Sequence, residues 1–300
     1  MNALRTDVRG SLRHHEPMAP HTSWRVGGPA EIFFEPADAD DLAAFLAGLP
    51  ADMPLFWMGL GSNLLVRDGG IDGVVIATSR GLGALQRLTS GAVRAEAGVP
   101  CAKLARLCER ERLAGGAFFA GIPGTLGGAL AMNAGAFGGE TWAQVTRVEV
   151  MNRAGARFWR DVAAYEVGYR HVAAPIPGEW FIAAEWRFEL VDEAASTGPS
   201  RVRELLARRA ATQPLGLPSC GSVFRNPLGD HAARLIEAAG LKGARCGDAE
   251  VSTKHANFII NRGQARAADI EALIERIQAE VWGRFGIELV PEVRIVGRVA

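Results

Sequence analysis

The sequence predicts an α+β fold with more than one domain, and three observations lead to this. Short strand-like segments alternate with helical patterns over the first hundred residues. Residues 145–190 then have strand composition almost throughout. Residues 201–285 hold three helical patterns with one short strand-like segment among them. A chain of 300 residues can form one large domain or two to three smaller ones.

The individual elements follow from local patterns. A helix at 37–49 opens with acidic residues that suit its N-terminus. A second helix at 101–113 follows Pro100 and places Leu104, Leu107 and Cys108 on one face that we expect to be buried. Further helices are expected at 201–212, 233–240 and 267–285, and strands at 31–36, 55–59, 73–78, 92–98, 257–261 and 292–297.

The clearest domain boundary is the polar, small-residue stretch VDEAASTGPS at 191–200, which has the composition of a linker. We place the boundary near residue 195. This divides the chain into a region of residues 1–195 and a C-terminal domain of residues 196–300.

Composition excludes several classes of protein. Lys plus Arg and Asp plus Glu both total 33, so the balance favours neither nucleic acid nor an anionic membrane as a partner. No apolar run is long enough to span a bilayer, and the first 17 residues lack the apolar core of a signal peptide. The four cysteines have no CxxC spacing, so we expect reduced thiols, no metal site and a cytoplasmic location.

Glycine is unusually frequent, with 36 among 300 residues, against an average of about 7%. Much of it lies in two segments, WMGLGSNLLV at 57–66 and AGIPGTLGGALAMNAGAFGGE at 120–140. Backbone N–H groups bared by glycine can hold phosphate oxygens. Leu64 occupies the place of the third glycine of a Rossmann fingerprint, and no Lys-Ser/Thr pair marks a P-loop. A tight turn between closely packed elements remains the alternative for each segment.

Three short polar segments also need an explanation. These are GYRH at 168–171, LPSCGSVFRNP at 217–227, and the alternating Glu292 and Arg294, which we expect on one face of a strand. From the residues alone, Arg170 could form a surface ion pair and Ser222 could belong to a turn. Glu292 and Arg294 could form the polar face of an edge strand. No GxSxG elbow marks Ser222 as an acyl nucleophile.

GLGSNLL followed at this distance by GIPGTLGGALAMNAGAFG resembles the flavin-binding half of the UDP-N-acetylenolpyruvoylglucosamine reductase family. TSWRVGGPA at 22–30 resembles the opening segment of the same family, and the likeness runs from about residue 20 to 297. The resemblance implies the vanillyl-alcohol-oxidase-like (PCMH-type) fold, with two subdomains at about 1–80 and 81–195 that hold non-covalent FAD. It implies FAD contacts from Gly59, Leu60, Gly61, Ser62, Asn63, Leu64, Gly121, Ile122, Pro123, Gly124, Gly127, Gly128, Asn133, Ala134 and Gly135.

The resemblance also implies a reaction, in which NADPH is the co-substrate and an enolpyruvyl nucleotide sugar is reduced. Hydride addition to its C=C bond develops an enediolate, which needs positive charge and hydrogen-bond donors. Arg170 would bind the carboxylate, and Ser222 would protonate the basic carbon. Glu292 would donate to the oxyanion as a protonated acid, or act through a shared proton. Substrate contacts are implied for Tyr169, Arg225, Asn226, Arg294 and His255, although His255 suits a structural role equally well.

Two departures and two rivals remain. Only nine residues separate Arg170 from Trp180, so the chain resembles the shorter type that lacks a tyrosine-bearing insertion. Cys220 stands where we expect a small residue and would fill space. The rivals are another FAD-dependent oxidase or dehydrogenase of the same superfamily, and a non-catalytic protein that binds nucleotide sugars. We expect a monomer.

Overall fold

The computed structural model describes residues 8–190 and 200–300. The chain folds into two compact units, each built from separate stretches of sequence. Unit 1 comprises Met1–Arg13, Phe33–Gly59 and Val74–Arg209, and unit 2 comprises His14–Ile32, Leu60–Gly73 and Ala210–Ala300. The linker predicted at 191–200 lies, apart from Ser200, outside the described residues.

A four-stranded sheet is formed in the first quarter of the chain, in the order β1-β2-β5-β3. β3 and β5 run parallel, from Leu55 beside Val74 to Met58 beside Ala77. α1 begins where the Asp38 carboxylate accepts from the backbone N–H groups of Asp40 and Asp41, a cap that stabilises a helix by about 1 kcal/mol. The bounds are β1 (Ser11–Pro17), β2 (Pro29–Glu35), α1 (Ala39–Ala47), β3 (Leu55–Met58) and β5 (Ile71–Ala77).

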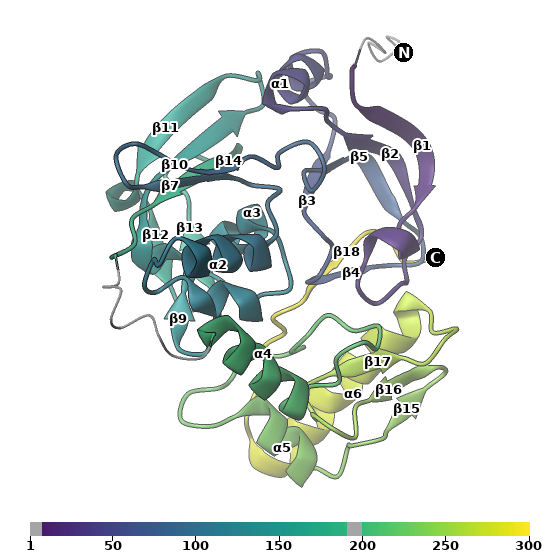
Figure 1. The fold of residues 1–300 in the computed structure, drawn as a ribbon. Coiled ribbons are helices and arrows are strands. Elements are labelled where there is room, and N and C mark those ends of the chain that lie inside the picture. Colours follow the sequence, from purple (N-terminus) through teal and green to yellow (C-terminus); the bar gives the residue numbers. More distant parts are fainter. Residues whose placement is uncertain (1–7, 191–199) are drawn as a thin grey trace. The chain divides into compact units, whose positions relative to one another are not determined.

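Unit 1 contains an antiparallel five-stranded sheet in the order β11-β10-β14-β7-β6. Alternate side chains of its central strands enter the main apolar core, and α2 and α3 cover that face (Figure 1). The bounds are β6 (Leu85–Arg87), β7 (Val93–Glu96), α2 (Cys101–Arg110), α3 (Leu126–Ala131), β10 (Val145–Asn152), β11 (Arg157–Asp161) and β14 (Glu179–Trp186).

The face of α2 that the sequence predicts to be buried is buried. Leu104 has no exposed surface, Leu107 is 6% exposed and Cys108 1%. The short elements that complete this part of the chain are η2 (Ala117–Gly121), β8 (Gly135–Ala136), β9 (Gly139–Glu140), η3 (Thr141–Gln144), η4 (Val162–Ala164), β12 (Glu166–Gly168), β13 (His171–Ala173) and α4 (Arg201–Thr212).

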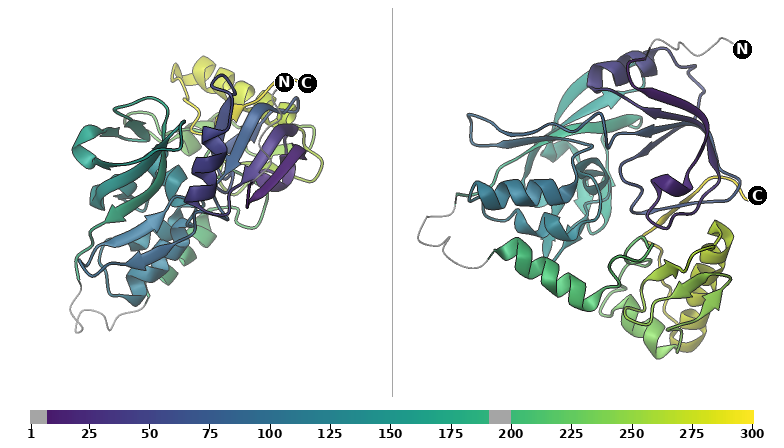
Figure 2. Two further views of the ribbon diagram at one scale, coloured as in Figure 1. Left: turned by 90° about the horizontal axis from the view of Figure 1, so that it is seen from above. Right: turned by 45° about the vertical axis from the view of Figure 1, so that its right-hand side comes forward.

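Unit 2 contains a three-stranded antiparallel sheet in the order β15-β16-β17, and α6 packs against all three strands. The right-hand view of Figure 2 shows α6 in yellow beside these strands. Trp24, which follows η1 in the chain, enters this core and donates its Nε1–H to the Ile259 carbonyl at 2.7 Å. The bounds are η1 (Ala19–His21), α5 (Ala232–Ala238), β15 (Arg245–Cys246), β16 (Ala249–Val251), β17 (Ile259–Asn261) and α6 (Ala267–Phe285).

The N-terminus of α6 holds a distant part of unit 2 in place. Asp68 accepts from the backbone N–H groups of Ala267 and Ala268, at 3.0 Å each. The neighbouring Arg67 forms a two-pronged ion pair with Glu271. These contacts fix the chain immediately after β4 (Leu64–Val66), which pairs in parallel with β18 (Arg294–Val296).

The expectation that Glu292 and Arg294 share a strand is wrong. β18 begins only at Arg294, because Val293 is a bend and Pro291, which has no N–H to donate, makes an isolated bridge with Phe224. Glu292 and Arg294 therefore do not share a strand whose alternation would place their side chains on one face. The other predicted helices and strands are present, with ends that differ by up to three residues from those expected.

Within residues 8–190 and 200–300, no helix is both long and apolar enough to cross a membrane.

Candidate active site

The two glycine segments meet in unit 1. A Cβ added to Gly59 would lie 2.2 Å from Thr125 Oγ1, so only glycine allows this approach. Thr125 is 2% exposed, and its hydroxyl finds no hydrogen-bond partner among residues 8–190 and 200–300. Gly128 leaves space beside this hydroxyl, since its added Cβ would meet only Thr125 Oγ1, at 3.9 Å. A buried hydroxyl that has no partner among the described residues and has glycines beside it fits a ligand oxygen.

The residues of the second glycine segment therefore fit FAD. Gly121, Ile122, Pro123 and Gly124 precede α3, and Gly127 is held against the sheet because its N–H donates to the Ala97 carbonyl at 2.8 Å. A side chain on Gly127 would meet Ala97 Cβ at 2.8 Å, so this helix can pack so closely only with glycine.

Asn133 is buried and its side chain is committed to the protein. The amide nitrogen donates to Glu140 and to the Gly168 carbonyl, at 3.0 Å each. The amide oxygen accepts from the Trp142 N–H at 3.2 Å. Asn133 therefore shapes the segment, which continues through Ala134 and Gly135, by tying it to the chain before Arg170.

Arg170 occupies the turn of the hairpin formed by β12 and β13, with a left-handed backbone φ of 54°. Its guanidinium donates to the carbonyls of Asn133 and Gly135, at 3.3 and 2.9 Å. It also lies over the ring of Tyr169, which is 53% exposed. The guanidinium is therefore anchored on the glycine segment itself.

The rest of the first glycine segment lies in unit 2. Gly61 has a φ of 62°, and its carbonyl accepts from the Ser23 N–H at 3.2 Å. The Asn63 amide donates to the Glu292 carbonyl at 3.0 Å, and the Arg294 N–H donates to the Asn63 carbonyl at the same distance. Leu64 pairs with Arg294. Leu60 is 45% exposed, and Ser62 is half-buried.

Ser222 and Glu292 are neighbours through the backbone of unit 2. The Glu292 N–H donates to the carbonyl of Val223 at 2.7 Å, and Val223 follows Ser222 directly. Both Ser222 and Glu292 are half-buried. The structure thus places the backbone of the predicted acid beside the residue that follows the predicted proton donor, although Ser222 and Glu292 are 70 positions apart in the chain.

Arg225 and Asn226 continue this segment. Arg225 Nε is buried and has no hydrogen-bond partner in the described part of the chain, which suits a guanidinium that binds an anion. Asn226 instead uses its side-chain oxygen to accept from the Ala232 N–H, at the first residue of α5. Its expected substrate contact would have to come from its amide nitrogen.

His255 is half-buried, and burial lowers the pKa of its imidazole. Its Nδ1 finds no partner among the described residues, and its ring packs edge-on against Phe258. Cys220 is 5% exposed and its thiol contacts the Leu64 carbonyl at 3.4 Å. Burial raises the pKa of this thiol to about 12, so Cys220 fills space as an uncharged group.

Sequence reasoning missed two residues beside the site. Thr125 stands inside the glycine segment, but nothing in its position showed that its hydroxyl would be buried without a partner in the described chain. Asn257 contacts the backbone of Phe224, which follows Ser222 and Val223. The signals for Asn257 were its place at the start of an apolar strand-like pattern and the likeness of STKHANFIINRG at 252–263 to the family.

Family models match two parts of the chain. A model described as an FAD binding domain matches residues 30–159. A second, described as the C-terminal domain of UDP-N-acetylenolpyruvoylglucosamine reductase, matches residues 213–296.

Curated relatives match over nearly the full length. A UDP-N-acetylenolpyruvoylglucosamine reductase of Alkalilimnicola ehrlichii is 62% identical over 297 residues, covering 99% of this chain and 98% of the relative. One of Methylococcus capsulatus is 59% identical, covering 96% and 94%. The crystal structure of UDP-N-acetylenolpyruvylglucosamine reductase from Thermus caldophilus superposes with a TM-score of 0.80 at 31% identity, covering 96% of this chain and 98% of that one.

An FAD-binding fold of the vanillyl-alcohol-oxidase-like type, followed by a C-terminal α+β domain, defines a flavoprotein oxidoreductase. The chain belongs to the UDP-N-acetylenolpyruvoylglucosamine reductase family, and FAD is its cofactor. The resemblance seen in the sequence is therefore confirmed, and a non-catalytic protein that binds nucleotide sugars is excluded.

Proposed function

We propose that this enzyme uses NADPH to reduce UDP-N-acetylglucosamine enolpyruvate to UDP-N-acetylmuramate, a precursor of peptidoglycan. Family membership supports the substrate class. The observation that carries the chemistry is the 2.7 Å hydrogen bond from the Glu292 N–H to the Val223 carbonyl, beside Ser222. We place the enzyme in the cytoplasm as a monomer, with residues 1–195 as the FAD-binding region and 196–300 as the substrate domain.

FAD, when bound, supplies hydride transfer at its N5 atom. The residues that would hold it include Gly59 and Thr125, where the buried hydroxyl lacks a partner in the described chain. Gly128 leaves space beside that hydroxyl. We also propose the other FAD contacts that the resemblance implies for the two glycine segments.

Ser222 acts as the proton donor to carbon. An alcohol is a weak acid, so this role requires a strongly basic acceptor, and the carbon of an enediolate is one. A serine in this role needs no histidine or lysine as a base. Ser222 is half-buried and lies next to a hydrogen-bonded backbone segment, which suits a hydroxyl that must be oriented toward the substrate carbon.

Arg170 and Glu292 stabilise the charge that develops on the substrate carboxylate. The Arg170 guanidinium is already oriented by two carbonyl oxygens of the glycine segment, which reduces the reorganisation needed in the transition state. Glu292 donates as a protonated acid, because an ionised carboxylate would repel the enediolate. Tyr169, Arg225, Asn226, Arg294 and His255 are proposed contacts to the nucleotide sugar.

The test separates two half-reactions under anaerobic conditions. Ser222→Ala is expected to leave flavin reduction by NADPH unchanged, because no proton to carbon is needed there. Reoxidation by the enolpyruvyl substrate is expected to slow by about 10²–10⁴-fold. Ser219→Ala, three residues earlier on the same segment, is the matched control and keeps both rates. Reoxidation of Ser222→Ala at the parental rate contradicts the assignment.

A further inference from the structure

We propose that Asn257 is a positioning residue that fixes the segment carrying Ser222, and so sets the aim of the Ser222 hydroxyl. The inference rests on the proposed function, since it matters for catalysis only if Ser222 is the proton donor. Asn257 lies in the loop between β16 and β17 and is 4% exposed.

Asn257 binds the two residues after Ser222 with three hydrogen bonds. Its backbone carbonyl accepts from the Val223 N–H at 2.9 Å. Its side-chain oxygen accepts from the Phe224 N–H at 2.9 Å, and its amide nitrogen donates to the Phe224 carbonyl at 2.8 Å. The side chain thereby satisfies both backbone groups of Phe224, as a neighbouring strand would.

The same segment is held from its other side by the chain before β18. The Val223 carbonyl accepts from the Glu292 N–H at 2.7 Å, and the Arg225 N–H donates to the Val290 carbonyl at 3.0 Å. Backbone groups on both sides of the segment are therefore satisfied. Since Ser222 is attached directly to Val223, these bonds restrict the position of its Cα, and the direction of its hydroxyl then depends on the torsion angles of Ser222 itself.

The loop that presents Asn257 is itself rigidly bonded. Ser252 accepts, through its side-chain oxygen, from the N–H groups of Lys254 and His255, at 3.1 and 3.2 Å. The Ser252 N–H donates to the Phe258 carbonyl, and the Phe258 N–H to the His255 carbonyl. Asn257 is thus a fixed point against which the segment is placed.

The primary amide of asparagine can accept from an N–H and donate to a carbonyl of one residue at any pH. An ionised aspartate keeps the acceptor and loses the donor, and alanine loses both. A protonated aspartic acid regains a donor, so Asn257→Asp offers a rescue that depends on pH.

The experiment compares Asn257→Ala and Asn257→Asp with Asn261→Ala in the FAD-loaded enzyme. Asn261 is the matched control because it is also buried, 5% exposed, and bonds Trp24, Gly263 and Ala265 instead. Asn257→Ala is expected to bind FAD and substrate within about threefold of the parent, and to slow reoxidation by about 10–100-fold. Asn261→Ala is expected to lose comparable thermal stability and to keep the reoxidation rate.

Two further measurements distinguish a misoriented Ser222 hydroxyl from a general loss of folding. In Asn257→Ala the solvent isotope effect on reoxidation should rise, because proton transfer becomes slower than hydride transfer. In Asn257→Asp the reoxidation rate relative to the parent should recover as pH falls and the introduced carboxyl is protonated. Neither readout should move in Asn261→Ala.

The inference is overturned if Asn257→Ala keeps the parental reoxidation rate, or slows both half-reactions alike. If Asn257→Ala does not fold, the test uses Asn257→Asp. A reoxidation rate of Asn257→Asp that keeps the same ratio to the parental rate at every pH overturns the inference. The proposed function fails separately, when Ser222→Ala itself reoxidises normally. Slow reoxidation of Ser222→Ala with normal reoxidation of Asn257→Ala leaves the function standing and removes only the positioning role.

Discussion

Gly59 and Thr125 touch so closely that a single added methyl group on Gly59 would overlap both the hydroxyl and the methyl group of the threonine, at 2.2 and 2.9 Å. Sixty-six positions of chain separate these residues, and each belongs to one of the two glycine segments. This contact is what joins the segments in unit 1, and it is the place where a substitution would part them.

Gly59→Ala is therefore expected to weaken FAD binding by about tenfold or more, since overlap with Thr125 must push the segments apart. Gly59 is not among the glycines with positive φ, so the effect comes from space and not from backbone strain. A fluorescence titration of the stripped protein with FAD measures the dissociation constant. Gly83→Ala is the control, because its added Cβ would meet only the Arg80 carbonyl at 3.9 Å. Equal losses in the two variants would contradict the prediction.

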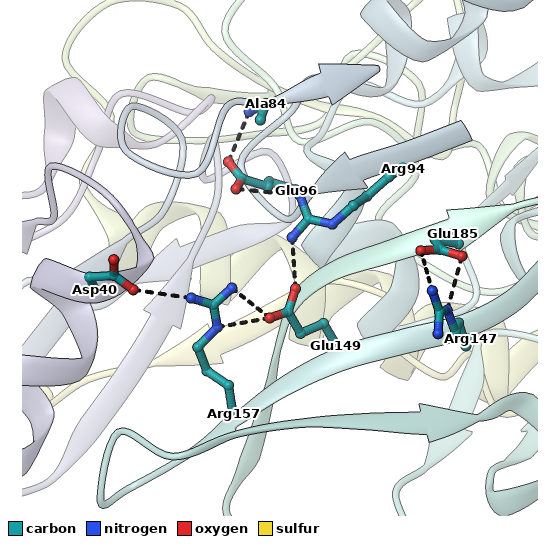
Figure 3. A network of polar contacts seen from close by, with 8 residues as sticks. All are labelled: Asp40, Ala84, Arg94, Glu96, Arg147, Glu149, Arg157 and Glu185. Atoms are coloured by element: carbon teal, nitrogen blue, oxygen red, sulfur yellow. Dashed lines mark hydrogen bonds and ion pairs between the residues drawn. The ribbon is translucent and has the colours of Figure 1, made fainter. Parts of the chain in front are cut away.

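Glu149 is expected to be a main contributor to the stability of the five-stranded sheet (Figure 3). Its carboxylate is 6% exposed and accepts from Arg94 at 2.7 Å and from Arg157 at 2.8 Å, while Arg157 continues to Asp40 of α1. Glu149→Gln should lower the free energy of unfolding by about 1–3 kcal/mol, less than for a fully buried pair because Arg157 is partly exposed.

Urea denaturation of that variant gives the measurement. The control is Glu280→Gln on α6, where the pair with Arg284 is largely exposed and should contribute less than about 0.5 kcal/mol. High salt should reduce the difference between parent and Glu149→Gln only in part, because burial protects the network from screening. A Glu149→Gln variant as stable as Glu280→Gln would refute the expectation.

Glu250 should make the stability of the fold depend on acid. Hydrogen bonds from Arg262 and then from Arg245 hold the pKa of this buried carboxyl below its ordinary value of 4.5. The stabilisation is therefore complete above pH 4.5 and is lost as pH falls through the lower native pKa.

Melting temperatures measured against pH test this directly. The gap between the parent and Glu250→Gln should be constant near neutrality and should shrink under acid conditions. Glu237→Gln, which alters an exposed pair with Lys242, should show a small gap at every pH. A Glu250→Gln gap that widens as pH falls would reverse the sign of the argument.

The sequence was informative where one local pattern determined the structure. α6 is found over the predicted residues 267–285, because its apolar periodicity and its C-terminal Gly286 in the left-handed region agree. α3 was hidden inside the second glycine segment, since its LGGALA sequence has low helix propensity and depends on packing. The strand expected to carry Glu292 begins two residues later, because Val293 is a bend and Pro291 forms an isolated bridge with Phe224, 67 positions away.

The candidate site divides in the same way. Resemblance pointed to Ser222, Arg170 and Glu292, and the hydrogen bonds around Arg170 could not be foreseen from it. Asn257 is buried and bonded to Phe224, whereas the buried Thr125 hydroxyl lacks a partner in the described chain. A single sequence shows neither which residues are buried nor which hydrogen bonds they form. Nor does the linear order reveal that Leu60–Gly73 packs in the same unit as Ala210–Ala300.

The parallel pairing of β4 with β18 has a consequence for biosynthesis. Leu64 pairs with Arg294, and at about 5–20 residues per second the ribosome makes them roughly 10–50 s apart. Until residues 292–296 emerge, β4 lacks β18 beside it and the Asn63 amide lacks the Glu292 carbonyl. We therefore expect that nascent chains truncated before residue 290 leave Asn63 and β4 without these partners, and that they bind flavin more weakly than chains that include β18.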